Sequence, residues 1–96
     1  MQAVYLVCSD IADPKRLRKV HELTLDHGTR LQFSVYQCEL SRMQLASFMA
    51  VLAEVIHHTG DQVLFVHLGP RQSLTYDCIE HLGRAYLPPA HRSYVS

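Results

Sequence analysis

The residue best placed to do chemistry stands where an apolar segment ends. Residues 4–8 are apolar, and Ser9 and Asp10 follow them directly. A short apolar run bounded by turn residues predicts a buried strand, so Asp10 is expected at the C-terminal end of that strand. A carboxylate in this position can hold a hard cation, because such ions prefer oxygen ligands. Asp10 is therefore the first candidate metal ligand.

A basic helix start is predicted just beyond this aspartate. Asp13 precedes Pro14, which is typical of a helix N-cap followed by proline at the first helical position. The basic residues that follow are Lys15, Arg16, Arg18 and Lys19. Guanidinium groups and a helix N-terminus can together bind phosphate. Taken alone, the motif also fits a carboxylate that only forms a turn or caps a helix, followed by basic side chains that are simply solvated.

Composition limits the kinds of partner. The chain has 96 residues, of which 48% are hydrophobic, and this is enough for the core of one domain. Nine basic and nine acidic residues give a formal net charge of zero, so nucleic-acid binding would have to come from a local patch. Most of the basic residues are arginines and lie before Met43. Arginine suits bidentate phosphate contacts better than lysine does.

Cysteine and histidine spacing gives no sign of a metal centre of its own. The three cysteines include no CxxC pair, and without a signal peptide they are expected to be buried thiols in a reducing cytoplasm. The seven histidines match no ligand spacing. No apolar run approaches the roughly 20 residues that a membrane helix needs, so no membrane association is expected.

Hydrophobic periodicity predicts the order of the elements. The first strand is expected at 3–9 and the first helix at 14–27, closed by Gly28 in a left-handed conformation. Residues 29–40 alternate in polarity, which predicts two strands, or one strongly bent strand, with a break near 32–34. Ser41 and Gln44 form a capping box for the second helix, which Gly60 ends.

The C-terminal part of the chain completes the predicted fold. Residues 62–68 are expected to form a central strand, and 77–84 a short strand or helical turn. The order is strand, helix, strand, strand, helix, strand, which predicts an α+β, ferredoxin-like β-α-β-β-α-β fold with an additional short C-terminal strand. The domain would span 1–84 and be followed by a tail at 85–96. One sheet face would remain bare, and a second copy could cover it in a homodimer.

Two motifs resemble one known family. Residues 10–13 read DIAD and precede the basic helix start, and residues 28–40 read GTRLQFSVYQCEL. Both motifs, at this separation, are similar to the Cas2 family of small CRISPR adaptation proteins. The resemblance covers about the first seventy residues, and 79–83 resembles the family's last short strand. Ser9 departs from the aromatic residue that the family often has before the aspartate, which could alter how an ion is shielded.

The resemblance implies a fold, an assembly and an activity. The protein would be a ferredoxin-like homodimer whose C-terminal strand extends the partner's sheet. Asp10 of each subunit would face its mate across the two-fold axis, and the pair would hold one Mg²⁺ ion. Asp10 would then be catalytic in a magnesium-dependent endonuclease that cleaves RNA or DNA. The dimer would also bridge two dimers of the CRISPR integrase Cas1 during spacer acquisition.

Further residues are assigned to the site on this basis. Arg16, Arg18 and Arg30 are expected to bind phosphate groups of nucleic acid. Ser34 and Tyr36 fall on the same side of the predicted strand as Arg30, and are expected to position the nucleic-acid backbone. Asp13 is expected to cap the helix. Asp13 and Ser9 are also expected to contact Asp10 and orient its carboxylate without binding the metal ion themselves.

Two alternatives remain open from the sequence. One is a toxin ribonuclease of the virulence-associated type, which shares the fold and the early aspartate. The other is a structural ferredoxin-like dimer with no site, which the zero net charge favours.

Overall fold

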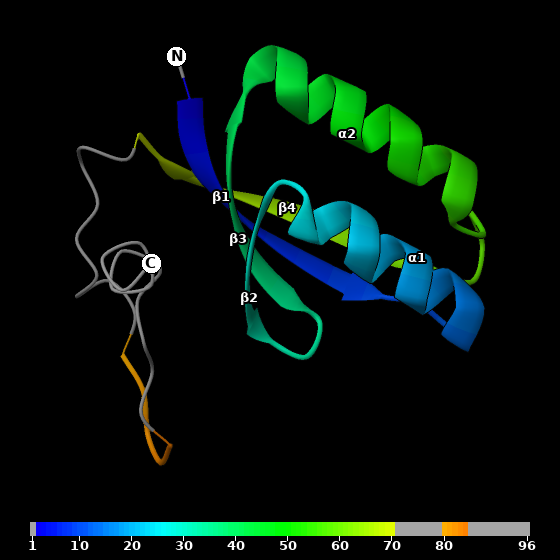
Figure 1. Cartoon of the computed structure of the whole chain (residues 1–96), viewed down its shortest axis with the longest axis horizontal. Coiled ribbons are helices and arrows are strands. Elements are labelled where there is room, and N and C mark those ends of the chain that lie inside the picture. Colours follow the sequence, from blue (N-terminus) through cyan, green and yellow to red (C-terminus); the bar gives the residue numbers. More distant parts are fainter. Residues whose placement is uncertain (1, 71–79, 85–96) are drawn as a thin grey trace.

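The elements follow the predicted order. The computed structural model describes residues 2–70 and 80–84 (Figure 1). Its elements are β1 (Gln2–Asp10), α1 (Pro14–Leu25), β2 (Gly28–Gln32), β3 (Val35–Ser41), α2 (Arg42–Val55) and β4 (Gln62–Gly69). The predicted β-α-β-β-α-β order is confirmed, and so is the break between the two strands of the 29–40 segment. No helix in this part of the chain is long and apolar enough to cross a membrane.

The sheet is antiparallel, with β1 in its interior. The strand order is β2-β3-β1-β4, and β1 pairs with both β3 and β4. Both helices cover the same face of this sheet (Figure 1). β4 is therefore an edge strand, and the prediction that it would be central was wrong. Burial alternates over residues 62–66 of this strand because only one of its faces packs against the helices.

Local signals set the start of each helix. Asp13 caps α1 by accepting a hydrogen bond from the Arg16 backbone N–H at 3.0 Å, and Pro14 follows in the first turn. Ser41 caps α2 by accepting from the Gln44 N–H at 3.1 Å, while the Gln44 side chain accepts from the Ser41 N–H at 2.8 Å. Both predicted caps are confirmed, and the second is a complete capping box.

The core lies between the helices and the sheet face that they cover. Tyr36, Cys38 and Leu40 point into it from β3, and Phe48 and Leu52 point into it from α2. The thiol of Cys38 is buried, as expected, and burial raises its pKa to about 11. A buried thiol of this kind is protonated and unreactive at neutral pH.

On the opposite face of the sheet, the described residues include no helix or second sheet, although Val4 of β1 is buried there. Leu6 of β1 lies directly opposite Val66 of β4, and Cys8 lies between Val35 of β3 and Leu64 of β4. Leu64 and Val66 are 49% and 43% exposed. We call this set (Leu6, Cys8, Val35, Leu64, Val66) the bare face. Its presence agrees with the prediction that two helices leave one side of the sheet uncovered.

The expected C-terminal strand falls mainly on residues that the structure does not describe. Residues 71–79, which include Cys78, and the tail at 85–96 lie outside the described ranges. Of the described residues 80–84, residues 82–84 form bends, and none of the five belongs to a strand.

Gly28 does not close α1 as predicted. In the described part of the chain, the glycines with positive φ are Gly69 and Gly83, while Gly28 is the first residue of β2. Its lack of a side chain matters for another reason. A Cβ at this position would lie 2.7 Å from the Cys38 Sγ and closer still to the Gln37 carbonyl oxygen. Glycine is therefore needed because β2 and β3 approach closely here.

We predict that Gly28→Ala destabilises the protein by about 1–3 kcal/mol, because the added methyl overlaps atoms of β3 that have no room to move. Urea denaturation measures this change as a lower midpoint. Gly60→Ala is the matched control, since its Cβ would meet the His57 Nδ1 at an ordinary 3.5 Å. Equal midpoints for the two variants would contradict the close-approach argument.

Candidate metal and nucleic-acid site

Asp10 projects from the end of β1 on the bare-face side. Residues paired directly across strands share a face, and Ser9 pairs with Val63, which packs against the core, whereas Asp10 pairs with the exposed Gln62. Asp10 itself is exposed. In the described part of the chain it has no hydrogen-bond or ion-pair partner. Its carboxylate is thus available for an external ligand.

Ser9 lies on the other side of the sheet. It is 8% exposed, and its hydroxyl is buried without a hydrogen-bond partner among the described residues. Its backbone N–H donates to the Ser34 carbonyl at 2.9 Å, which ties the end of β1 to the β2–β3 turn. Because successive side chains on a strand point to opposite faces, the Ser9 hydroxyl faces away from the Asp10 carboxylate. The expectation that Ser9 supports the Asp10 ligand is therefore not met.

One subunit offers an incomplete set of metal ligands. Within residues 2–70 and 80–84, no three His, Cys, Asp or Glu side chains gather where they could hold a metal ion. Asp13, the nearest acidic residue in sequence, is used as the α1 cap. Mg²⁺ keeps several waters and needs only one or two carboxylates from a protein. The residues present fit such an ion if a second Asp10 is brought alongside the first.

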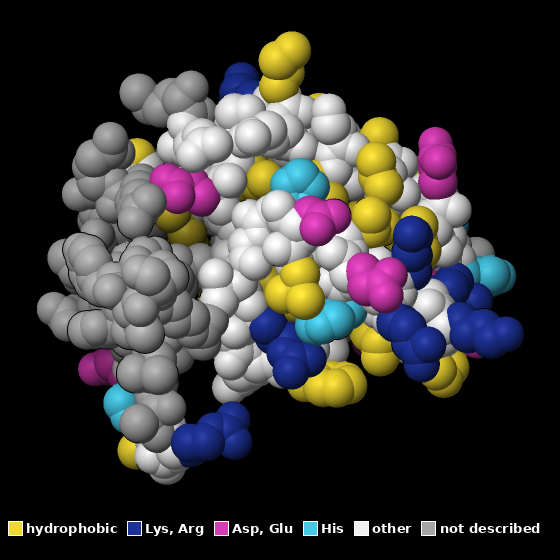
Figure 2. Space-filling view, in the orientation of Figure 1, with side chains coloured by type: hydrophobic (Ala, Val, Ile, Leu, Met, Phe, Trp, Pro, Cys, Tyr) yellow, Lys and Arg dark blue, Asp and Glu magenta, His cyan; other side chains and the backbone are white. Residues whose placement is uncertain are grey.

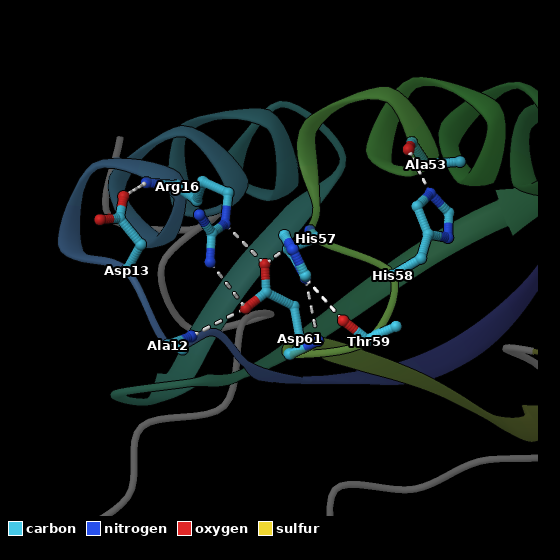
Figure 3. A network of polar contacts seen from close by, with 9 residues as sticks. Ala12, Asp13, Arg16, Ala53, His57, His58, Thr59 and Asp61 are labelled. Carbon is cyan, nitrogen blue, oxygen red and sulfur yellow. Dashed lines mark hydrogen bonds and ion pairs between the residues drawn. The ribbon is translucent and has the colours of Figure 1, made fainter.

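A buried carboxylate fixes the loop that follows Asp10. Asp61, just before β4, accepts from the Arg16 Nε at 2.7 Å and from the Arg16 Nη2 at 3.3 Å (Figure 3). It also accepts from the Ala12 N–H at 2.9 Å and from the His57 N–H at 2.8 Å. The Asp61 side chain has no exposed surface. This one group joins the β1–α1 loop, the first turn of α1 and the α2–β4 loop.

The same contacts perturb the titration of both partners. The hydrogen bond from Arg16, together with those from the His57 and Ala12 backbones, holds the pKa of Asp61 well below its usual range. In return, the hydrogen bond to Asp61 raises the pKa of Arg16. The pair is therefore ionised at neutral pH.

Arg16 is consequently paired with a carboxylate of its own chain, although 31% of its side-chain surface stays exposed. Its guanidinium makes the bidentate pair with Asp61, although it was expected to bind phosphate. Sequence reasoning missed Asp61 altogether. The two residues are 45 positions apart, and a lone aspartate after a glycine turn carries no local signal of a partner so distant.

Other basic side chains are exposed on the surface. Lys15, Arg18 and Lys19 are exposed on the first turns of α1, and Arg30 is exposed on β2. Figure 2 shows Lys and Arg side chains gathered over the start of α1. These positions form a local basic patch despite the zero net charge.

The structure corrects the expectation for Tyr36. Its side chain is 1% exposed, and its hydroxyl lies 2.7 Å from the His21 Nδ1 of α1. Burial raises the pKa of this hydroxyl, against the opposing charge of Arg30. Tyr36 is a core residue and is not available to nucleic acid. Ser34 lies in the β2–β3 turn, not on a strand, and its carbonyl holds the end of β1.

Comparison with known proteins gives a consistent family. Residues 3–75 match the family described as CRISPR associated protein Cas2. The chain is 31% identical to the CRISPR-associated endoribonuclease Cas2 of Geobacter sulfurreducens over 95 residues, which covers 99% of each chain. It is 32% identical to the CRISPR-associated endonuclease Cas2 of Halalkalibacterium halodurans, over 78% of this chain and 75% of that one.

Solved structures show the same fold. The crystal structure of Streptococcus pyogenes Cas2 superimposes with a TM-score of 0.73 at 30% identity, covering 83% of this chain and 99% of that one. A hypothetical protein from Thermus thermophilus superimposes with a TM-score of 0.77 at 24% identity, covering 93% of this chain and 99% of that one. The second likeness concerns the fold alone.

We predict that Asp61→Asn lowers the melting temperature at neutral pH, because a buried, hydrogen-bonded charge is lost from the junction of three segments. A depressed folded-state pKa contributes stability above the unfolded value of about 4, and that stability is lost as the pH falls. The gap between wild type and variant should therefore narrow below about pH 4. Differential scanning calorimetry from neutral to acid pH measures this difference in melting temperature.

Glu22→Gln, an exposed change on α1, is the control, and its melting temperature should follow the wild type across the pH range. A gap for Asp61→Asn that stays constant on acidification would contradict the linkage to this carboxylate.

Proposed function

The chain belongs to the Cas2 family of CRISPR-associated proteins, and from this premise we propose that it is a nuclease and adaptation subunit that acts as a homodimer. The dimer binds DNA or RNA and bridges dimers of the integrase Cas1 during spacer acquisition. The observation that carries the proposal is the exposed Asp10 at the end of β1, within a chain that matches the family over residues 3–75. This match favours a Cas2 protein over a virulence-associated toxin ribonuclease or an inert dimer.

The bare face supports the homodimer. Apolar side chains from three neighbouring strands lie together there, and Leu64 and Val66 expose nearly half of their surface. Burying such a face against its own copy removes apolar surface from water, which is the main favourable term in association. A two-fold axis is the commonest arrangement that pairs a surface with itself. Free, partly buried Cys8 on this face fits a reducing, cytoplasmic protein.

The dimer would complete the metal site. Asp10 lies on the side of the sheet that a second copy would cover, so a two-fold axis near the end of β1 brings two carboxylates together. Two close carboxylates repel each other unless a cation or a proton intervenes. A shared Mg²⁺ would satisfy both and, when bound, would stabilise negative charge on the phosphate oxygens of a cleaved strand.

Protein side chains around Asp10 would hold the nucleic acid. Arg18, with Lys15 and Lys19, presents exposed positive charge on the first turns of α1, and Arg30 presents exposed positive charge on β2. Backbone contacts of this kind fix a strand in place without reading its sequence. Arg16 contributes indirectly by holding the Asp61 carboxylate, and Asp13 by capping α1.

We predict that Asp10→Asn abolishes magnesium-dependent cleavage while leaving the fold and nucleic-acid binding intact. Loss of a group that only supports a metal ligand lowers metal affinity or activity by about 10- to 100-fold. Loss of the ligand itself should lower the cleavage rate by at least as much. Cleavage of labelled single-stranded RNA and duplex DNA, with Mg²⁺ and with chelator, measures the change. Asp26→Asn, an exposed change just after α1, is the control. Equal cleavage by Asp10→Asn and wild type would remove Asp10 from the reaction.

We also predict that Arg18→Gln weakens duplex DNA binding and reduces the salt dependence of binding by about one counterion for each copy in contact. Fluorescence anisotropy over a series of salt concentrations measures both quantities. Arg42→Gln is the matched control, because Arg42 is also exposed at a helix start but opens α2, at the other end of the helix layer (Figure 1). Equal effects of the two variants would mean that binding depends only on overall charge.

A further inference from the structure

One aromatic side chain is exposed on the surface and takes no part in the core. Phe33 lies in the β2–β3 turn and is 71% exposed, whereas Phe48 in the core is 2% exposed. The guanidinium carbon of Arg30 lies 6.0 Å from the centroid of the Phe33 ring, within the range of a cation–π contact. The arginine covers one side of the ring, and the large exposed fraction leaves the other side open.

The turn that carries Phe33 adjoins the end of β1. The neighbouring Ser34 carbonyl accepts from the Ser9 N–H at 2.9 Å, and Val35 pairs with Cys8. Figure 1 shows the β2–β3 turn at the same end of the sheet as the C-terminus of β1. Phe33 and Asp10 are therefore presented at one end of the molecule.

The position of Arg30 argues against a second copy of this chain as the partner that packs on the open face of the Phe33 ring. Arg30 pairs directly with Tyr36, whose side chain points into the core, so Arg30 projects from the helix-covered side and not from the bare face. Burying its charge in an apolar interface would carry a large desolvation penalty. The exposed positive charge of Arg30 beside the ring instead favours a ligand that carries a negative charge and has an aromatic face.

An unpaired nucleotide has both properties. Every base offers a π-face for stacking, and its phosphate offers a negative charge to an arginine. In a duplex the bases are already stacked on one another, so the ring could be reached only by unpaired nucleotides.

We propose that Phe33 is a stacking platform for an unpaired base of the bound nucleic acid, with Arg30 supporting the ring and neutralising the adjacent phosphate. The proposal rests on the proposed function and narrows its ligand to nucleic acid with single-stranded nucleotides at this end of the sheet. Because stacking reads no hydrogen-bond pattern, the platform tolerates any base.

The absence of tryptophan from the chain allows a direct test. Phe33→Trp, in an Asp10→Asn background and with chelator present, places one fluorophore at the platform. Titration with a short oligothymidylate should quench its emission saturably, in parallel with binding followed by anisotropy of a labelled oligonucleotide. Met43→Trp is the matched control, because Met43 is 81% exposed at the start of α2, and its emission should stay unchanged. Equal quenching at both positions, or none at position 33 while anisotropy reports binding, would overturn the proposal.

Affinity gives an independent readout in the natural chain. Phe33→Leu should weaken single-strand binding by about 5- to 100-fold, the range seen for loss of one base–aromatic stack, and Phe33→Tyr should restore it. Duplex binding should stay unchanged in both variants. If duplex affinity and its dependence on Arg18 persist while Phe33→Leu leaves single-strand binding unaltered, the platform fails and the proposed function stands. If the wild type binds neither nucleic acid, both fail.

Discussion

The alternation of side chains along β1 sets the arrangement on which the rest of the structure depends. Because β1 is paired on both edges, its register cannot slip without disrupting two ladders at once. Val7 and Ser9 face the helices, while Cys8 and Asp10 face the other way. A shift of one residue would turn the carboxylate toward the helices and carry Tyr5 and Val7 out of the core. The chemistry available at Asp10 thus follows from the packing of Val7.

A second constraint acts on the loop beyond that strand. Asp61 binds the backbone N–H of Ala12, two residues after Asp10, and the guanidinium of Arg16, so it restricts where the chain can turn after β1. The same contact neutralises the charge of Arg16 with a buried carboxylate. The basic helix start therefore has two parts: Arg16 holds the fold together, and Arg18 with its exposed lysine neighbours faces outward.

The features that could be predicted from the sequence are those encoded within a few residues. The cap at Asp13 and the capping box of Ser41 with Gln44 need only neighbouring positions, and both were correct. The edge position of β4 and the role of Gly28 depend on which strands become neighbours, which no local pattern reveals. For the same reason the partner of Arg16 was missed.

At the candidate site, two residues on the same face of the sheet differ in their access to solvent. Arg30 and Tyr36 do lie on one face, as their spacing indicated, but that face is the one covered by the helices. Arg30 stays exposed because β2 is an edge strand. Tyr36 lies on the interior strand β3, and its hydroxyl contacts His21 of α1. Alternation assigns a residue to a face, and only the strand order decides whether that face reaches solvent. In a protein with no net charge, the positions of a few arginines, rather than their number, then determine where a polyanion can bind.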